Sequence, residues 1–413
     1  MSQAAAPSWN EQVPMQGPDS RLKRRERFYA WQTRQGCLEL PFPLEEYAER
    51  VSRARALMAD QGLDALLVCG DPGHPGDIRW IANWEPSVGN AFLFLPAQGE
   101  PVLVLHDEVP GYNLCATWVK EVLPPSRGAG GLRKLQDDLL GLLGDHCVQH
   151  RLGLVSEAGL PLQVYQGIVT DRPHLEMADV TVAFARLRAV KSAREVEKVR
   201  EAVRQSDAAM KVAVELVHEG VSEREVVAEV LRSLFLEGAD GVAFMPLVVA
   251  GPRAAWKHAS PTSRPIRKGE PVYIDLGASY QGYCADLSRT VLLGKPTPEQ
   301  AMALEFALAA TAAMREAARP GIPAGALAQV GDEVAARFGL ADRAWGTGHG
   351  LGCKLREEPL LDRANDLLLQ PGMVMAIEPM CVCEWGTFVI EDDLLITETG
   401  SEVLSHSPRR NWG

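Results

Sequence analysis

The sequence lacks several features that would have assigned a function at once. No apolar run approaches the roughly 18 residues of a membrane span, and the first 40 residues mix prolines with polar residues instead of forming an apolar secretion core. No Gly-x-Ser-x-Gly elbow, His-Glu-x-x-His pair or Walker loop occurs. Positive charge is also scarce, since 42 basic residues face 54 acidic ones and give a net charge of −12. We therefore expect a cytoplasmic protein with neither nucleic acid nor membrane as a partner.

The cysteines give no sign of a zinc site. Cys381-Val-Cys383 has no second Cys or His pair at ligand spacing. Without an export signal, we expect all eight cysteines to be reduced and largely buried. The one basic run, Arg21–Arg27, is typical of a solvated helix face within a possible helix over Arg21–Gln35.

The length of 413 residues exceeds what one hydrophobic core usually supports. We predict an extension over 1–42, an α/β domain over 43–189 and a second domain over 190–413. In the first domain a helix over Leu44–Gln61 precedes short apolar strands. In the second, two helices and a hairpin occur twice, which indicates a duplicated α+β domain. The elements expected there are helices 193–217, 222–237, 299–318 and 324–338, and strands 271–279, 282–293, 373–383 and 387–397.

Four acids lie inside apolar strands of this second domain: Asp275, Asp286, Glu378 and Glu391. A turn centred between Tyr280 and Gln281 would place Asp275 directly opposite Asp286, with Cβ atoms about 5 Å apart. Buried carboxylates at that distance repel each other unless one is protonated or a cation binds both. The pattern therefore predicts a metal site.

His349 adds a fifth potential ligand, within the glycine-rich run from Gly346 to Gly352. A lone histidine in such a loop is more often structural, but four acids in strands favour a ligand. Four carboxylates and one imidazole suit two divalent ions that share bridging carboxylates; we expect Mn²⁺, with Co²⁺, Fe²⁺ or Zn²⁺ as alternatives. Such a pair activates a bridging hydroxide for hydrolysis.

These motifs, together with His258, resemble the pita-bread metallohydrolases: prolidase, aminopeptidase P and creatinase. The resemblance implies a pita-bread catalytic domain after a creatinase-type α/β domain, in a homodimer whose partner subunit helps to close the pocket. It implies that Asp275 binds one ion, that His349 and Glu378 bind the other, and that Asp286 and Glu391 bridge them. Glu378 would also shuttle a proton, and His258 would bind substrate and steady the tetrahedral intermediate. The stretch Trp80–Trp84 is either a lid or part of the core.

Two positions depart from the proline-specific pattern of these enzymes. Arg356 stands where a second active-site histidine is usual, and Val389 stands where an arginine is usual. Arg356 either binds a substrate carboxylate or turns outward to pair with Glu357 or Glu358. Three functions stay open: an Xaa-Pro dipeptidase or aminopeptidase, a metal-dependent hydrolase of a C–N bond in a small metabolite, or a binding module.

Overall fold

The computed structural model describes residues 30–108 and 113–411. The basic run Arg21–Arg27 lies outside these residues, as does most of the helix expected over Arg21–Gln35, of which α2 (Trp31–Arg34) falls within them. The chain divides into two compact units. The second unit, 180–413, also takes in two segments from the N-terminal part of the chain, 50–57 and 74–80. Within the described ranges, no helix has the length and apolar character that crossing a membrane requires.

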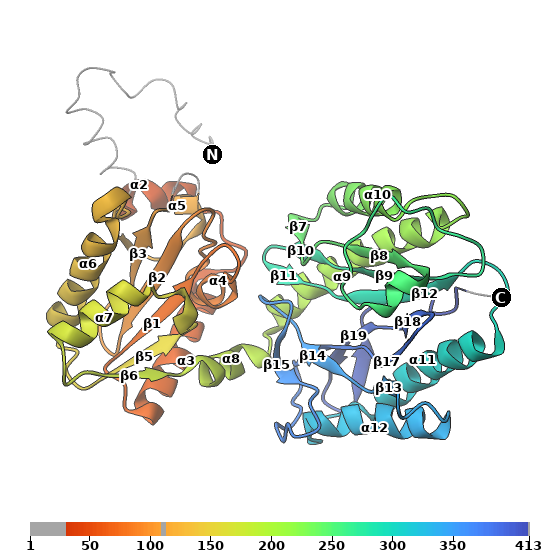
Figure 1. Cartoon of the computed structure of the whole chain (residues 1–413). Helices are drawn as coiled ribbons and strands as arrows, with labels where there is room; N and C mark the ends of the chain where they lie inside the picture. Colours follow the sequence, from red (N-terminus) through yellow and green to blue (C-terminus); the bar gives the residue numbers. More distant parts are fainter. Residues whose placement is uncertain (1–29, 109–112, 412–413) are drawn as a thin grey trace, which may run out of the picture. The chain divides into compact units, whose positions relative to one another are not determined.

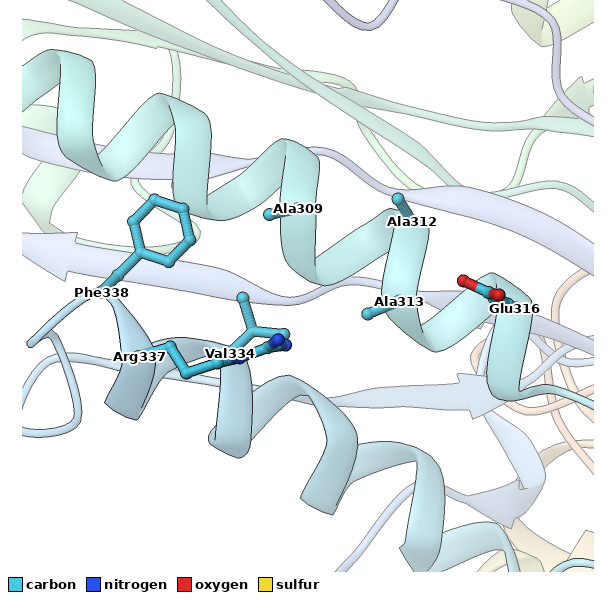
Figure 2. Close-up of a pocket in the computed structure, with 7 residues that line it drawn as sticks. All are labelled: Ala309, Ala312, Ala313, Glu316, Val334, Arg337 and Phe338. Atoms are coloured by element: carbon cyan, nitrogen blue, oxygen red, sulfur yellow. The ribbon is translucent and has the colours of Figure 1, made fainter.

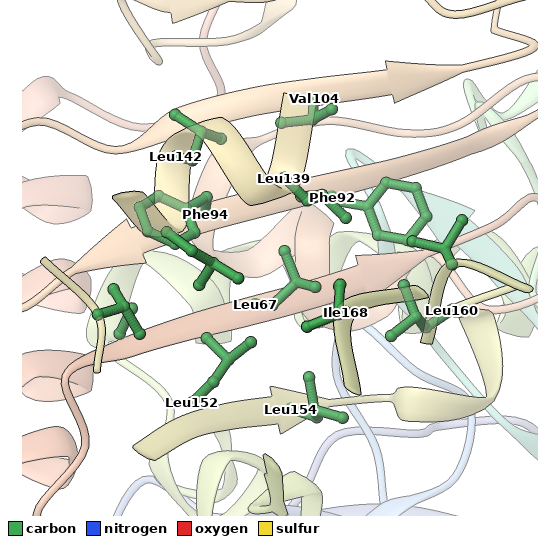
Figure 3. Packing of buried hydrophobic residues seen from close by; sticks show 14 of the residues in the cluster. Leu67, Phe92, Phe94, Val104, Leu139, Leu142, Leu152, Leu154, Leu160 and Ile168 are labelled. Carbon is green, nitrogen blue, oxygen red and sulfur yellow. The ribbon is translucent and has the colours of Figure 1, made fainter. Parts of the chain in front are cut away.

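The first unit is built on a six-stranded mixed sheet of order β4-β3-β2-β1-β5-β6. All six residues of the central strand β1 are buried, because helices cover the sheet. Figure 3 shows Leu139 and Leu142 of α6 directed at Phe92 and Phe94 of β2. The elements of this part of the chain are α3 (Leu44–Gln61), β1 (Ala65–Gly70), α4 (Gly76–Ala82), β2 (Asn90–Pro96), β3 (Val102–His106), α5 (Asn113–Ala116), β4 (Glu121–Val122), α6 (Gly131–Asp145), β5 (Arg151–Val155), α7 (Leu162–Asp171) and β6 (Glu176–Asp179), with 3₁₀ turns η1 (Gln35–Cys37), η2 (Gly128–Gly130) and η3 (Glu157–Gly159).

The expectation of eight reduced, largely buried cysteines is wrong. Cys37 and Cys115 form a disulfide across 78 residues of sequence, with Cα atoms 5.6 Å apart. Cys147 is exposed. The error has a physical reason: tertiary packing brings the two bonded cysteines together, and nothing in their local sequence records this proximity.

The second unit has the duplicated arrangement that the sequence predicted. Helices α9 and α10 accompany the first hairpin, and α11 and α12 accompany the second (Figure 1). Ser192 and Ser222 each close a capping box at the start of α9 and α10, which fixes where those helices begin. The helices are α8 (Thr181–Ala189), α9 (Ala193–Leu216), α10 (Glu223–Leu236), η4 (Gly251–Ala255), α11 (Pro298–Ala317) and α12 (Ala324–Arg337). The remaining strands are β7 (Gly241–Val242), β8 (Leu247–Ala250), β13 (Ala344–Trp345), β14 (Gly348–Gly350), β15 (Glu357–Leu360) and β20 (Ser401–Val403).

Three of the four predicted hairpin strands are divided at the position where an acid stands, and the first is divided at Gly277, two residues after Asp275. The first hairpin consists of β9 (Pro271–Leu276), β10 (Ala278–Tyr280), β11 (Tyr283–Cys284) and β12 (Leu287–Leu292). The second consists of β16 (Val374–Ile377), β17 (Met380–Cys383), β18 (Gly386–Val389) and β19 (Asp392–Ile396). Asp286, Glu378 and Glu391 all lie in the breaks. These acids can therefore leave the regular pleat and turn toward one another.

The register of the first hairpin differs from the prediction. Asp275 pairs with Ser288, and Tyr280 pairs with Tyr283. The turn is therefore Gln281–Gly282, whose φ angles of 46° and 83° are both positive, as the favoured two-residue hairpin turn requires. Asp286 is therefore not directly opposite Asp275: it precedes Ser288, the observed partner of Asp275, by two residues and lies in the break between β11 and β12.

Candidate metal centre

Three side chains from three separate segments converge on one point. Ligand atoms of Asp286, His349 and Glu391 all lie within 4.8 Å of one another. His349 Nε2 lies 3.4 Å from Asp286 Oδ2 and 3.9 Å from Glu378 Oε1. Asp275, on β9, lies near enough to Glu378 for their charges to interact, and all five side chains are buried. Three of the five residues singled out as metal ligands thus converge on one point, with Glu378 beside His349 and Asp275 near Glu378.

His349 lies in a strand and not in the loop that its glycine neighbours suggested. β14 is bordered by β15 and β16, with His349 opposite Ala376. Its Nδ1 is 3.1 Å from the carbonyl oxygen of Gly350, which can only accept a hydrogen bond. Nδ1 therefore carries the proton, and the unprotonated Nε2 faces the acids, as a metal-binding imidazole requires.

The protein alone compensates only part of the charge of this cluster, through Lys257 and Arg356 beside Glu378. Burial raises the pKa of Asp275 to about 6, and the nearby Glu378 carboxylate adds to the effect. Burial, followed by repulsion from neighbouring acids, also raises the pKa values of Asp286 and Glu391 well above their usual range. Burial lowers the pKa of His349, which keeps the ring neutral. The cluster therefore favours the uptake of positive charge.

The donor set fits divalent cations. Four carboxylates and one imidazole offer mostly hard oxygen ligands, which suit ions of this class. Asp275 Oδ1 is buried and has no hydrogen-bond partner within the described part of the chain. An unpaired buried carboxylate oxygen costs free energy, and coordination to a cation would offset that cost.

Several neighbours hold the acids in place. The Tyr273 hydroxyl donates a hydrogen bond to Asp275 Oδ2, and Ser288 Oγ donates to Glu391 Oε2 at 2.6 Å. The backbone N–H of Asp286 donates to Asp393 Oδ2 at 3.1 Å. Each contact leaves other carboxylate oxygens free to face the centre. Such supporting contacts fix the orientation of metal ligands.

Two basic side chains contact Glu378 from the solvent side. Lys257 Nζ lies 3.1 Å from Glu378 Oε2, and Arg356 Nη1 lies 3.7 Å from Glu378 Oε1. His258 is exposed beside them; its pKa is lowered by partial burial and by the Lys257 charge. Lys257 was missed from the sequence, because a lysine in a loop carries no local signal and only its place next to His258 hinted at a role.

Arg356 does not turn toward Glu357, which was one of its two expected positions. The Glu357 carboxylate is buried and bonds Arg188 and, at 2.6 Å, Lys191 Nζ. Val389 is buried in an apolar cluster that includes Tyr273 and therefore offers no polar contact to a substrate. Position 389 therefore contributes no positive charge, and the cationic side chains beside Glu378 are Lys257 and Arg356.

Trp80 and Trp84 belong to the core, and the lid interpretation is wrong. Each side chain is 1% exposed. Trp80 Nε1 donates a hydrogen bond to Glu195 Oε1 at 3.0 Å. The sequence left both alternatives open, because an aromatic residue in a lid and one in a core have the same local sequence pattern.

A surface hollow of about 450 Å³ between α11 and α12 lies apart from the metal centre (Figure 2). Its lining is mostly apolar, with one acid and one arginine, and includes none of the five residues singled out as metal ligands. The lining residues are Ala309, Ala312, Ala313, Glu316, Val334, Arg337 and Phe338. Since no cluster of titratable groups faces it, the chemistry belongs to the buried acids and not to this hollow.

Known proteins resemble the chain over both units. Residues 197–398 match the model of metallopeptidase family M24, and residues 50–190 match that of the creatinase/prolidase N-terminal domain. An Xaa-Pro dipeptidase of Pyrococcus horikoshii is 32% identical over 363 residues, which cover 87% of this chain and 98% of that protein. An Xaa-Pro dipeptidase of Pyrococcus furiosus is 35% identical over 225 residues, which cover 54% of this chain and 65% of that protein. The crystal structure of the prolidase from P. horikoshii superimposes with a TM-score of 0.77 and 27% identity, covering 88% of this chain and 99% of that one.

Proposed function

Because this chain belongs to metallopeptidase family M24, we propose that it is an Xaa-Pro dipeptidase that works with two divalent metal ions. Membership makes the chain a metallohydrolase with a pita-bread catalytic domain behind a creatinase-type domain. The observation that supports the proposal best is the convergence of Asp286, His349 and Glu391 within 4.8 Å. The two alternatives, a hydrolase of non-peptide C–N bonds and a binding module, are not favoured, because the relatives are named as Xaa-Pro dipeptidases.

The proposal assigns a role to each converging residue. Asp275 binds one ion, His349 and Glu378 bind the other, and Asp286 and Glu391 bridge the two. When bound, two such ions would polarise the scissile carbonyl and acidify a water molecule. Burial of all five donors supports this assignment, because exclusion of water strengthens each electrostatic interaction.

The chain's own side chains handle the proton and the substrate in this proposal. Glu378 accepts a proton from the attacking water and delivers it to the leaving nitrogen, for which its position beside His349 is suitable. His258 binds the substrate carbonyl from the exposed rim and donates a hydrogen bond as negative charge develops on its oxygen. Arg356 binds a substrate carboxylate, since its guanidinium is 54% exposed and reaches Glu378.

Four further parts of the proposal rest on the sequence-based expectations. Manganese is the proposed physiological metal, a homodimer the proposed assembly and the cytoplasm the proposed compartment. The proposed domains are 43–189 and 190–413, behind an extension over 1–42. Elemental analysis of the native protein, sedimentation, cell fractionation and limited proteolysis test these four points in turn.

Hydrolysis of dipeptides tests the central proposal. Purified protein, stripped of metal and then titrated with Mn²⁺, should cleave Ala-Pro and Gly-Pro once two ions per chain are bound. Ala-Ala serves as the control substrate and should be cleaved far more slowly. If the metal-free protein were fully active, or if no Xaa-Pro dipeptide were cleaved at any metal content, the proposal would be wrong.

A further inference from the structure

Lys257 and Arg356 contact different oxygens of one buried carboxylate, that of Glu378. Among the residues that the structure describes, Lys257 and Arg356 are the lysine and arginine that pair with an acid of the cluster. They come from different segments, one following η4 and one preceding β15. On the basis of the proposed function, we infer that Lys257 determines specificity: with Arg356 it binds the free carboxylate of a dipeptide.

The exposed fractions place both cations between the cluster and the solvent. The side chain of Lys257 is 27% exposed and that of Arg356 is 54% exposed, whereas that of Glu378 is 8% exposed. The charged heads therefore reach inward from the solvent to a buried acid. A substrate that approaches Glu378 from this side meets both positive charges first.

The charge balance leaves these cations available to a ligand. Asp275, Asp286, Glu378 and Glu391 carry four negative charges when ionised, and two divalent ions would neutralise all four. The charges of Lys257 and Arg356 would then face the site without a full counter-charge. Two neighbouring cations that lack an anion favour binding one, and a carboxylate has two oxygens to share between them.

The short separation between the attacked carbonyl and the free carboxylate favours a dipeptide over other ligands that carry a carboxylate. In a dipeptide, three bonds separate the attacked carbonyl carbon from the terminal carboxylate carbon, so the two lie within about 4 Å of each other. Lys257 Nζ and Arg356 Nη1 lie 3.1 and 3.7 Å from the oxygens of Glu378, the acid proposed to serve the attacked carbonyl, so both cations lie close to where that carbonyl would be. A longer peptide presents a neutral amide in place of the carboxylate and offers the two cations no negative charge. The site therefore favours a dipeptidase over an aminopeptidase that acts on long chains.

Binding of a non-hydrolysable ligand tests the role of Lys257 separately from catalysis. The probe is an Ala-Pro analogue with a reduced peptide bond, compared with its C-terminal carboxamide by calorimetry on the Mn²⁺-loaded protein. We expect the wild type to prefer the carboxylate by about 10- to 100-fold, the range for a hydrogen bond to a charged group. Lys257→Met should remove most of this preference, and Lys257→Arg should restore it.

The control variant is Lys211→Met, which removes an exposed lysine that pairs with Glu215 on α9. It should leave the preference unchanged. Bound Mn²⁺ is counted in every variant, because Lys257 also contacts Glu378 and a purely structural role would alter metal content and not the carboxylate preference. An unchanged preference in Lys257→Met, or equal loss of affinity for both ligands, overturns the inference.

The two hypotheses fail in different ways. A wild type that cleaves no Xaa-Pro dipeptide contradicts the proposed function, yet the ratio of the two dissociation constants still decides the role of Lys257. An active dipeptidase whose Lys257→Met variant keeps its carboxylate preference contradicts only the inference about Lys257.

Discussion

Replacement of Asp275 by asparagine should stabilise the metal-free protein, although it removes a proposed metal ligand. The amide keeps the shape of the side chain, and its oxygen can still accept the hydrogen bond from Tyr273. What disappears is a buried negative charge. Burial and the Glu378 carboxylate raise the pKa of Asp275 from 3.8 to about 6, so ionising this group costs more in the folded chain than in the unfolded one.

The size and sign of the effect follow from that shift. A rise in the pKa of Asp275 from 3.8 to about 6 corresponds to about 3 kcal/mol of lost folding stability above pH 6. Since the folded pKa is raised, the penalty is absent below pH 4 and grows as the pH rises from 4 to 6. Metal-free Asp275→Asn should therefore exceed the wild type by about 3 kcal/mol in free energy of unfolding at pH 7, and should match it near pH 4.

Urea unfolding of metal-free protein at pH 7 and pH 4 measures this difference, with Asp366→Asn as the control because Asp366 is exposed. Excess Mn²⁺ should remove most of this difference in stability. Metal at 100 times its dissociation constant stabilises the wild type by about 2.7 kcal/mol, and the variant lacks a charged ligand. If both proteins had equal stability at pH 7 without metal and gained equally with it, our account of the cluster would be refuted.

Three further outcomes follow from the same structure. Asp286→Ala should lower kcat/KM for Ala-Pro by at least about a thousandfold while circular dichroism stays unchanged, because the proposed bridge is lost; an active variant would contradict the site. Gly277→Ala should cost about 1–3 kcal/mol in urea unfolding, since the added Cβ would lie 1.9 Å from the Ala285 carbonyl oxygen; wild-type stability would show that this strand can shift. Glu357→Gln should cost about 3–5 kcal/mol, because it removes the charged partner of the buried Lys191 and leaves the buried Arg188 with Asp77 alone, and a loss below 1 kcal/mol would contradict that reasoning.

Much of the fold could be predicted because local patterns control it. The helix starts at Ser192 and Ser222 follow from capping boxes that need only four consecutive residues. The end of α3 follows from Gly62, which adopts the left-handed conformation with φ of 63°. The predicted hairpin register was wrong by one residue at the turn, because the turn was centred between Tyr280 and Gln281, whereas the positive φ angles fall on Gln281 and Gly282.

The sequence by itself determined the chemistry of the metal centre. Acids inside apolar strands are costly unless something compensates them, so Asp275, Asp286, Glu378 and Glu391 stand out in the sequence alone. Their order along the chain also carried the resemblance to a metallohydrolase family, which the comparisons then confirmed.

Only the tertiary structure decided which basic groups surround those acids. Lys257 is separated from Glu378 by 121 residues, and Cys37 is separated from its disulfide partner by 78. The free-energy cost of burying an acid depends on the apolar strand that contains it, so it leaves a local pattern in the sequence. Pairing between distant groups depends on how the chain returns to the same place, and that path exists only in the folded protein.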